Sequence, residues 1–199
     1  MAETLIKLPD PIQEAGISLA ESLAKRRTIR NFRPQQVTLQ EVAQLLWAAQ
    51  GITSHDGFRT APSAGALYPL EIHLVAGQVV GVSPGSYRYD PLRHSLTSEV
   101  SGDLRTELAQ VALGQSWISE APAVIVVSAV YSRTTFKYGR RGERYVHIEV
   151  GHAGQNLLLQ ATALGLASAT VGAFNDAELK RLLGLPDDEL PMIILPVGH

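Results

Sequence analysis

The spacing of apolar and polar residues along the chain predicts a series of helices and strands. A capping box of Thr38 and Glu41 precedes an apolar stripe, and Gly51 follows the stripe, which predicts a helix between them. A shorter helix is expected over Leu19–Lys25, and two more over residues 101–113 and 175–183. Each of these helices would cover part of a core with one apolar face.

Strand patterns occur between these helices. Leu70–Ala76 alternates apolar and polar positions, and short strands are expected near residues 87–89 and 95–97, where turn-forming sequences flank them. Ala123–Val130 is a continuous apolar run, which predicts a central strand buried on both faces. Further strands are expected near residues 167–171 and over the closing run at residues 192–198.

The most informative helix is predicted over residues 143–164. Apolar or small residues occupy almost every face of this segment. A helix that is apolar nearly all round is buried on several sides. In a chain of 199 residues, burial in an oligomer interface is a natural explanation.

Composition limits the classes of protein to consider. Hydrophobic residues make up 45% of the chain and charged residues 18%, and the formal net charge of -2 gives no reason to expect nucleic acid. The absence of cysteine excludes disulfides, thiolate metal sites and cysteine nucleophiles, and it favours a reducing compartment. No segment has the pattern of a signal peptide or a membrane span, so a cytoplasmic protein is expected. Residues 1–16 are predicted to form an N-terminal arm, and residues 17–199 a single domain.

Positive charge is concentrated in the sequence RRTIRNF at residues 26–32. An extended backbone would direct Arg26, Thr28 and Arg30 to one side and Arg27 to the other. Two guanidinium groups and a hydroxyl are donors that suit a phosphate. A solvated basic end of the preceding helix is the alternative.

Two other segments favour a flat ligand. In the loop APSAGALYP at residues 61–69, two prolines stiffen a run of small residues, so that backbone can approach a ligand closely. The sequence ATVGAF at residues 169–174 ends a strand at Gly172 and Ala173, whose amides would meet a ligand's polar edge. Each segment, taken alone, also fits an ordinary turn.

Together these segments resemble the FMN-dependent nitroreductase superfamily, and most closely its SagB/ThcOx-type dehydrogenase branch. RRTIRNF resembles the family's N-terminal Arg-Arg-Ser-x-Arg-x-Phe motif, and APSAGALYPLEIHLV is similar to the loop and following strand of that branch. GHAGQNLLLQATALGLASATVGAF resembles the long dimer-core helix that leads to the flavin-edge strand, and LPVGH resembles the closing strand. The resemblance implies an α+β fold with a mixed central sheet flanked by helices, an intertwined homodimer, and two FMN sites at the dimer interface.

The resemblance also implies cofactor-binding residues. The phosphate, ribityl chain and pyrimidine edge of FMN would be held by Arg26, Arg27, Thr28 and Arg30. The same flavin would be approached from the other subunit by Pro62, Ser63, Ala64, Gly65 and Leu67. Backbone contacts near the flavin N5 edge would come from Gly172 and Ala173. The family often adds a basic residue beyond the last strand, and none follows His199 in this sequence.

The segment TFKYGRRGERY at residues 135–145 supplies candidate catalytic residues. Lys137 and Tyr138 resemble the Lys-Tyr pair of azoline dehydrogenases, in which a base removes a carbon-bound proton while hydride leaves. The alternative is a surface loop whose basic residues attract an anionic substrate or cofactor.

The reaction implied by the resemblance is hydride transfer through flavin N5 between NADH or NADPH and a nitro, quinone or similar acceptor. Ala66 and Tyr68 stand where many nitroreductases have asparagine and glutamine, which puts classical nitroarene specificity in doubt. A second possibility is an azoline-to-azole dehydrogenase acting on peptides, and a third is a flavin-binding carrier or sensor without turnover. No metal site is expected, because the histidines lack enough neighbouring ligands.

Overall fold

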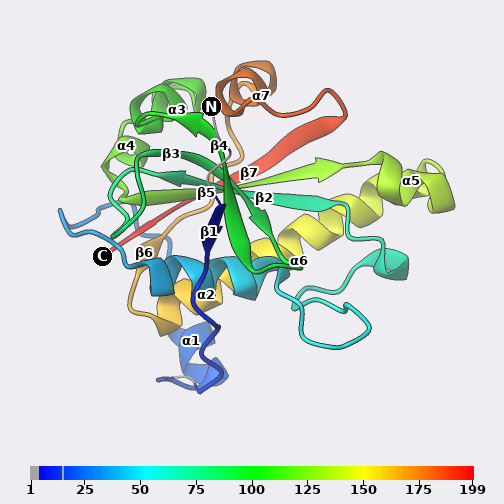
Figure 1. Cartoon of the computed structure of the whole chain (residues 1–199), viewed down its shortest axis with the longest axis horizontal. Coiled ribbons are helices and arrows are strands. Elements are labelled where there is room, and N and C mark those ends of the chain that lie inside the picture. Colours follow the sequence, from blue (N-terminus) through cyan, green and yellow to red (C-terminus); the bar gives the residue numbers. More distant parts are fainter. Residues whose placement is uncertain (1–4, 15) are drawn as a thin grey trace.

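A seven-stranded sheet forms the centre of the computed structural model, which describes residues 5–14 and 16–199 (Figure 1). The order of strands across the sheet is β1-β4-β3-β2-β5-β7-β6. The strands are β1 (Leu5–Lys7), β2 (Leu70–Ala76), β3 (Gly85–Asp90), β4 (Ser95–Ser101), β5 (Ala123–Val130), β6 (Ala167–Ser168) and β7 (Glu189–Gly198). The long strands β2, β5 and β7 lie next to one another at the middle of the sheet.

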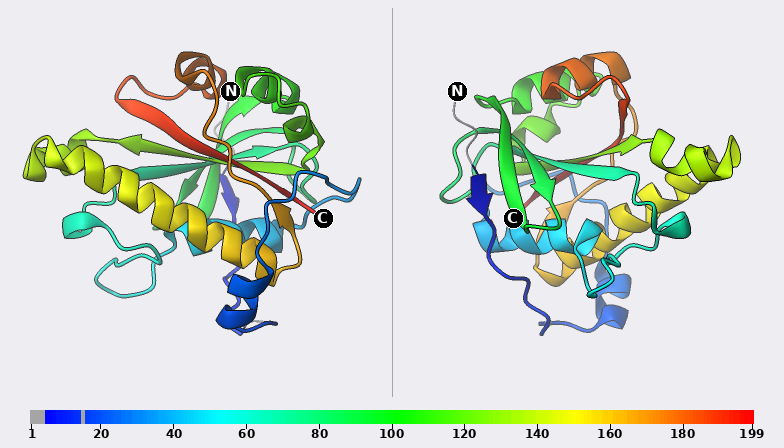
Figure 2. Two further views of the ribbon diagram at one scale, coloured as in Figure 1. Left: turned by 180° about the vertical axis from the view of Figure 1, so that it is seen from behind. Right: turned by 45° about the vertical axis from the view of Figure 1, so that its right-hand side comes forward.

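Helices cover both faces of this sheet, which confirms the α+β class (Figure 2). The helices are α1 (Leu19–Lys25), α2 (Leu39–Gln50), the 3-10 turn η1 (Ala64–Ala66), α3 (Arg105–Val111), α4 (Trp117–Glu120), α5 (Ser132–Tyr138), α6 (Arg141–Ala163) and α7 (Asp176–Leu183). The ladders between named strands are antiparallel, where a mixed sheet was expected, and a parallel pairing occurs at the isolated bridge between Val37 and Val79. Within residues 5–14 and 16–199, no helix is long and apolar enough to cross a membrane.

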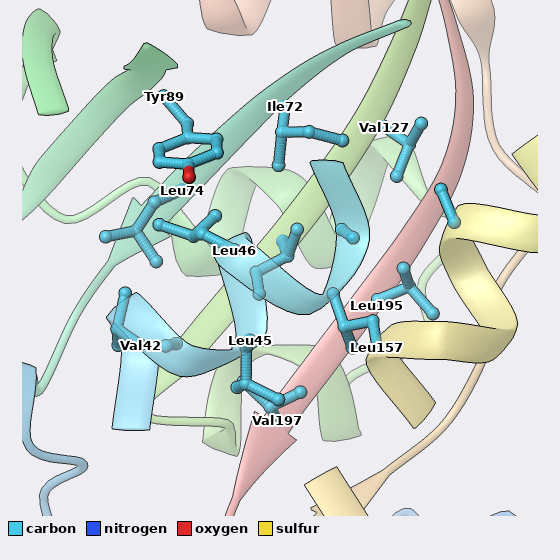
Figure 3. Close-up of a cluster of buried hydrophobic side chains, with 14 of the residues drawn as sticks. Val42, Leu45, Leu46, Ile72, Leu74, Tyr89, Val127, Leu157, Leu195 and Val197 are labelled. Carbon is cyan, nitrogen blue, oxygen red and sulfur yellow. The ribbon is translucent and has the colours of Figure 1, made fainter. Parts of the chain in front are cut away.

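Alternation along the central strands divides the core into two layers. Ile72 and Leu74 of β2 pack in one layer with α2 and with Leu157 of α6 (Figure 3). Val75 belongs to a second layer on the opposite face, together with residues of α3 and α7. Every residue of β5 is buried, as its continuous apolar run predicted.

Local signals explain why α2 begins and ends where the sequence predicted. The Thr38 side chain accepts a hydrogen bond from the Glu41 amide, and the Glu41 carboxylate accepts one from the Thr38 amide at 2.7 Å. Gly51 follows the helix, and a Cβ atom there would lie 2.1 Å from the Trp47 ring. The chain must therefore have glycine at this position to leave α2 and enter the loop at residues 52–69.

Several element boundaries differ from those predicted. The helix expected over residues 101–113 is shorter, because β4 continues to Ser101 and α3 begins only at Arg105. Residues 132–138 form α5, a helix that the periodicity did not indicate. Near the N-terminus, β1 pairs with β4 at the sheet edge and Leu8 is buried in the core, although this segment was expected to lie outside it. The division of the chain into an arm and a domain remains a prediction.

Candidate functional site

The arginine segment leaves α1 as extended chain. The amide of Ile29 donates to the carbonyl of Ser168 at 3.0 Å, which ties the segment to β6. Arg27 turns back toward α1, where its Nη1 donates to the carbonyl of Ala24 at 3.0 Å. The guanidinium of Arg30 lies over the ring of Trp117, 5.5 Å from its centroid. Arg27 and Arg30 thus make different contacts, and the expected alternation along the segment remains a prediction.

Gly172 and Ala173 follow Ser168, to which the arginine segment is tied, by four and five residues. Both are exposed, and within the described residues neither backbone amide donates a hydrogen bond to another protein group. The side chain of Gln115 donates to the carbonyl of Ala173 at 3.2 Å, only two residues before Trp117. We call Arg26, Thr28, Arg30, Trp117, Gly172 and Ala173 the arginine half-site. It offers guanidinium, hydroxyl and amide donors, which are the groups that an anionic cofactor with a polar ring edge requires.

The second predicted segment folds into a tight turn around η1. Gly65 has φ +65°, and Ala66 and Tyr68 also have positive φ. Ser63 holds the turn because its Oγ accepts from the Tyr68 amide at 2.9 Å. Arg59 supports it from outside, with its guanidinium 4.4 Å from the centroid of the Tyr68 ring. Positive φ is costly for residues other than glycine, so these contacts stabilise a loop that would not adopt this shape on its own.

Lys137 and Tyr138 lie directly against this loop. A Cβ atom on Gly65 would be 2.8 Å from the hydroxyl of Tyr138 and 3.0 Å from Nζ of Lys137. Tyr138 packs edge-on against Tyr145 of α6 at 5.2 Å between ring centroids. The structure therefore brings the proposed catalytic pair next to the loop, although the two segments are about 70 residues apart in the sequence. We call residues 62–68, Lys137, Tyr138 and Glu149 the loop half-site.

The two half-sites lie on opposite sides of one chain. The arginine segment follows α1 at the C-terminal end of α6, whereas the loop and α5 lie near its N-terminal end (Figures 1 and 2). One cavity of about 390 Å³ is lined by Arg27 and by Thr162 of α6, and another of about 230 Å³ by Ser63 and Glu149. At 1.5 Å per residue, Glu149 and Thr162 are separated by roughly 20 Å along the helix. One chain does not bring the predicted cofactor residues together.

Glu149 is the residue of the loop half-site that sequence patterns did not reveal. It is only 2% exposed, and burial raises its pKa to about 7, although Ser63, Gln50 and the charge of Arg59 act in the opposite direction. Among the described residues, its Oε1 has no hydrogen-bond partner. The available signal was a single glutamate among the positions of the long helix that face the core.

A second buried polar cluster lies on the sheet, where Glu71 and Arg133 connect its member Arg88 to the carbonyl of Tyr68. Nε2 of His73 contacts Glu189 at 2.6 Å, and its Nδ1 contacts Glu99 at 2.8 Å. Arg88 donates to Glu99 at 2.9 Å and to Glu189 at 3.0 Å. Burial lowers the pKa of His73, but the two carboxylates raise it further, so that its pKa lies above the ordinary value. Every member of this cluster is paired, which indicates a structural role.

The remaining candidates do not form a catalytic group. His147 contacts the hydroxyl of Tyr131 at 2.6 Å, and His152 is exposed at the edge of the cavity beside Glu149. His55 is exposed in the loop that follows α2. In the described part of the chain, no three His, Cys, Asp or Glu side chains are grouped so that they could hold a metal ion.

Known proteins include relatives of this chain in sequence and a solved structure with the same fold. The chain is 47% identical over 200 residues to the MJ1384 protein of Methanocaldococcus jannaschii, covering 100% of this chain and 98% of that protein. It is 25% identical over 142 residues to the microcin B17-processing protein McbC of Escherichia coli, covering 69% of this chain and 52% of McbC. A crystal structure from Ralstonia eutropha JMP134 superposes with a TM-score of 0.86 at 28% identity, covering 98% of this chain and 89% of that one.

The match to a family model is equally broad. The model of the nitroreductase family matches residues 23–199, which include both half-sites and all strands except β1. McbC and the trifolitoxin operon protein TfxC of Rhizobium leguminosarum agree with the SagB/ThcOx-type branch that the loop sequence resembles. The chain therefore belongs to the nitroreductase family.

Proposed function

We propose that the protein is an FMN-dependent oxidoreductase that acts as a homodimer. Bound FMN would supply hydride transfer between NADH or NADPH and a nitro, quinone or similar acceptor. The observation that carries this proposal is the division of the cofactor residues into two half-sites at opposite ends of α6. Two chains would complete two sites if the loop half-site of one met the arginine half-site of the other.

The fit of FMN rests on the donors and shapes of the described residues. In the arginine half-site, Arg26, Thr28 and Arg30 would neutralise and orient the phosphate, and the amides of Gly172 and Ala173 would meet the polar ring edge. In the loop half-site, Gly65 leaves no space for a side chain between the loop backbone and the Lys137–Tyr138 pair. This packing would hold the loop in place. Its backbone at residues 62–67 would then approach a flat ring and exclude water from one side of that ring.

The surface of α6 supports a second copy of the chain as the partner. Ile148 is 46% exposed on this helix, and Leu158 and Leu159 are half-buried. On α5, the side chain of Phe136 is 93% exposed. Large apolar side chains exposed along one helix and its neighbour are typical of an interaction surface. A cytoplasmic location also remains a proposal, supported by the absence of cysteine from the sequence.

Mixing two defective variants tests the shared site. One chain would carry Arg26→Ala with Arg30→Ala, and the other Gly65→Val, which places a branched side chain at positive φ against Tyr138. Each variant alone should bind no FMN. After unfolding and refolding together, the mixture should recover about one quarter of wild-type occupancy, because half of the dimers are mixed and each keeps one intact site. Sites formed within one chain would give no recovery.

A second candidate function is oxidation of an azoline in a peptide to an azole. It is favoured by the position of Lys137 and Tyr138 over the loop, where a base would lie beside the substrate. Lys137→Ala should then retain FMN but lose azoline oxidation, while Arg140→Ala, an exposed change just after the same helix, should retain both. Equal azoline oxidation by the Lys137→Ala variant and the wild type would remove this role. The relatives McbC and TfxC make such peptides worth testing as substrates.

A third possibility, a flavin carrier or sensor without turnover, belongs to a different functional class. It would use the arginine half-site and the loop at residues 62–68 but would need neither Lys137 nor Tyr138. Such a protein would bind FMN and show no oxidation of NADH or NADPH with any acceptor. Steady-state nicotinamide oxidation by the FMN-loaded dimer therefore separates it from the enzyme.

A further inference from the structure

Glu149 combines three features that an ordinary core residue lacks. The residue is 2% exposed, its Oε1 has no partner among the described residues, and it lines a cavity of about 230 Å³. Buried carboxyl groups are usually paired, because an unpaired charge in a low-dielectric site is costly. The rest of the cavity wall comes from the loop at Pro62, Ser63 and Ala64 and from α6 at Tyr145, Ile148 and His152.

The groups around Glu149 form a polar connection between α2 and the loop. Nη1 of Arg59 donates to Oε1 of Gln50 at 2.9 Å, while the amide nitrogen of Gln50 is buried beside Glu149 and has no well-formed hydrogen bond within the described residues. On the other side of the carboxyl lies Ser63, whose Oγ accepts from the Tyr68 amide. The carboxyl therefore stands between a fixed residue at the end of α2 and the hydroxyl that holds the loop in its tight turn.

Few charges are available to compensate an ionised Glu149. The titratable groups that face it are Arg59 from the loop, and Tyr145 and His152 from α6. Lys137 and Tyr138 of α5 lie beyond the loop, against Gly65. Arg59 is also attracted by Glu71 and lies over the ring of Tyr68, so its charge is shared. Burial thus outweighs the groups that favour the ionised form, and the pKa of Glu149 rises to about 7, where the neutral and ionised forms are about equally populated.

The protonation state changes what the carboxyl can do. A protonated carboxyl both donates and accepts a hydrogen bond, whereas a carboxylate only accepts. The neutral form can remain buried beside Ser63, while the ionised form is stabilised by water and by separation of the cavity walls. Because the cavity wall is the loop itself, ionisation of Glu149 acts on the segment expected to approach the flavin.

We infer that Glu149 is a positioning residue, whose protonated form holds the loop at residues 61–69 in the shape that receives the flavin ring and whose ionisation loosens that loop. This inference rests on the proposed function, because it assigns the loop to FMN. Glu149 acts through Ser63 and the loop backbone and need not touch the reacting atoms. FMN affinity should therefore fall as the pH rises through the range in which Glu149 loses its proton.

The test is the dissociation constant of FMN for the dimer, measured by flavin fluorescence from pH 5.5 to pH 8.5. Wild-type affinity should fall by about tenfold over this range, a typical size for coupling between two sites. Glu149→Gln keeps the shape of a neutral carboxyl, and its FMN affinity should not show this fall with rising pH. Glu149→Asp keeps a titratable group and should restore a pH dependence, and Glu143→Gln, an exposed change on the same helix, should behave as wild type.

Two further measurements distinguish the loop from the phosphate contacts as the source of the pH dependence. Riboflavin lacks the phosphate, so its affinity should show the same difference between wild type and Glu149→Gln if the loop is responsible. Hydrogen exchange of the backbone amides at residues 61–69, corrected for the intrinsic pH effect, should increase with pH in the wild type and not in the variant.

Each outcome decides one proposal. Parallel pH profiles of FMN affinity for wild type and Glu149→Gln would overturn the role of Glu149 and leave the flavin site intact. A wild-type protein that binds no FMN at any pH would contradict the proposed function. In that case the exchange data still test the effect of Glu149 on the loop. Protection of the amides at residues 61–69 that does not change with pH in either protein would overturn that effect.

Discussion

Two glutamates of this chain are almost equally buried and differ in nearly everything else. Glu189 is 1% exposed, and it contacts His73 at 2.6 Å, Ser128 at 2.5 Å and Arg88 at 3.0 Å. Burial alone would raise its pKa, but these hydrogen bonds and charges lower the pKa to about 2. Glu149 is 2% exposed and has an oxygen without a partner in the described part of the chain, and burial raises its pKa to about 7.

The difference shows that partners, rather than burial, decide the role of a buried carboxyl group. Glu189 lies within a charge cluster that joins β2, β3, β4, β5 and β7, so its ionised form is part of the architecture. Glu149 lies between a helix and a loop, where few charges compensate it. A carboxyl of the first kind stabilises the sheet, and one of the second kind can respond to pH.

Removing Glu189 should have the largest effect. Glu189→Ala removes the more deeply buried of the two carboxylates that His73 and Arg88 share, and breaking a buried ion pair costs about 3–5 kcal/mol. Denaturant unfolding at pH 7 should show this loss in the free energy of unfolding. Glu107→Gln, an exposed change on α3, is the control and should change stability by less than about 0.5 kcal/mol. A similarly small loss in Glu189→Ala would contradict the structural role of the cluster.

Replacing Glu149 should raise the free energy of unfolding at neutral pH, whereas replacing Glu189 should lower it. Its folded-state pKa of about 7 lies above the ordinary value of 4.5, so the folded state binds more protons between these two pH values. Wild-type stability should therefore fall as the pH rises from about 4.5 to about 7. At 1.36 kcal/mol per pKa unit, Glu149→Gln should be more stable than wild type by up to about 3 kcal/mol at pH 8, and no more stable at pH 4. Thermal unfolding across this range checks the prediction, and a stability difference that does not vary with pH would contradict it.

Changing the arginine half-site should affect the cofactor more than the fold. Under the proposed function, Arg26→Ala would remove a charge-assisted contact to the FMN phosphate. Such a contact is worth about 1.5–3 kcal/mol, so FMN should dissociate roughly 10- to 150-fold more readily. Arg181→Ala on α7 is a suitable control because that side chain is exposed. Arg105 would be a poor control, since it bonds to Asp103 at 2.7 Å and to the Ala121 carbonyl at 3.0 Å. Equal FMN retention by the Arg26→Ala and Arg181→Ala variants would remove the phosphate assignment.

The smallest effect on stability is expected at Lys137. Its side chain is exposed, and Nζ lies 5.4 Å from the centroid of the Tyr138 ring. Lys137→Ala should therefore change the free energy of unfolding by less than about 0.5 kcal/mol and leave FMN bound. A strong loss of stability, measured by denaturant unfolding, would mean that Lys137 supports the loop rather than a reaction.

The elements of the fold that depend on local sequence signals could be predicted from the sequence. Local signals identified α2 through Thr38 and Glu41, α7 through its cap Asn175, and the buried strand β5 through its apolar run. The arginine segment was singled out by its concentration of charge and the loop by its prolines and small residues, and the resemblance to a family then assigned both to an FMN site. The family itself is confirmed by a match over residues 23–199.

What escaped prediction depends on residues that are distant in the sequence. His73 and Glu189 are 116 positions apart, and nothing in their local sequences indicates that they meet. Glu149 is separated from Ser63 by the whole of β2 to α5, and only the fold brings both to one cavity. The helix α5 was missed because residues 132–138 lack an apolar stripe, and packing against α6 stabilises the helix instead.

The most direct test of the central claim is an absorbance spectrum of the purified protein after incubation with FMN and removal of the free cofactor, followed by anaerobic addition of NADH and, separately, NADPH. The proposed function predicts the absorbance bands of oxidised flavin, bleached by at least one nicotinamide and restored by a quinone or nitro compound. A protein that retains no FMN, or whose bound flavin neither nicotinamide reduces, would contradict an NAD(P)H-dependent flavin oxidoreductase.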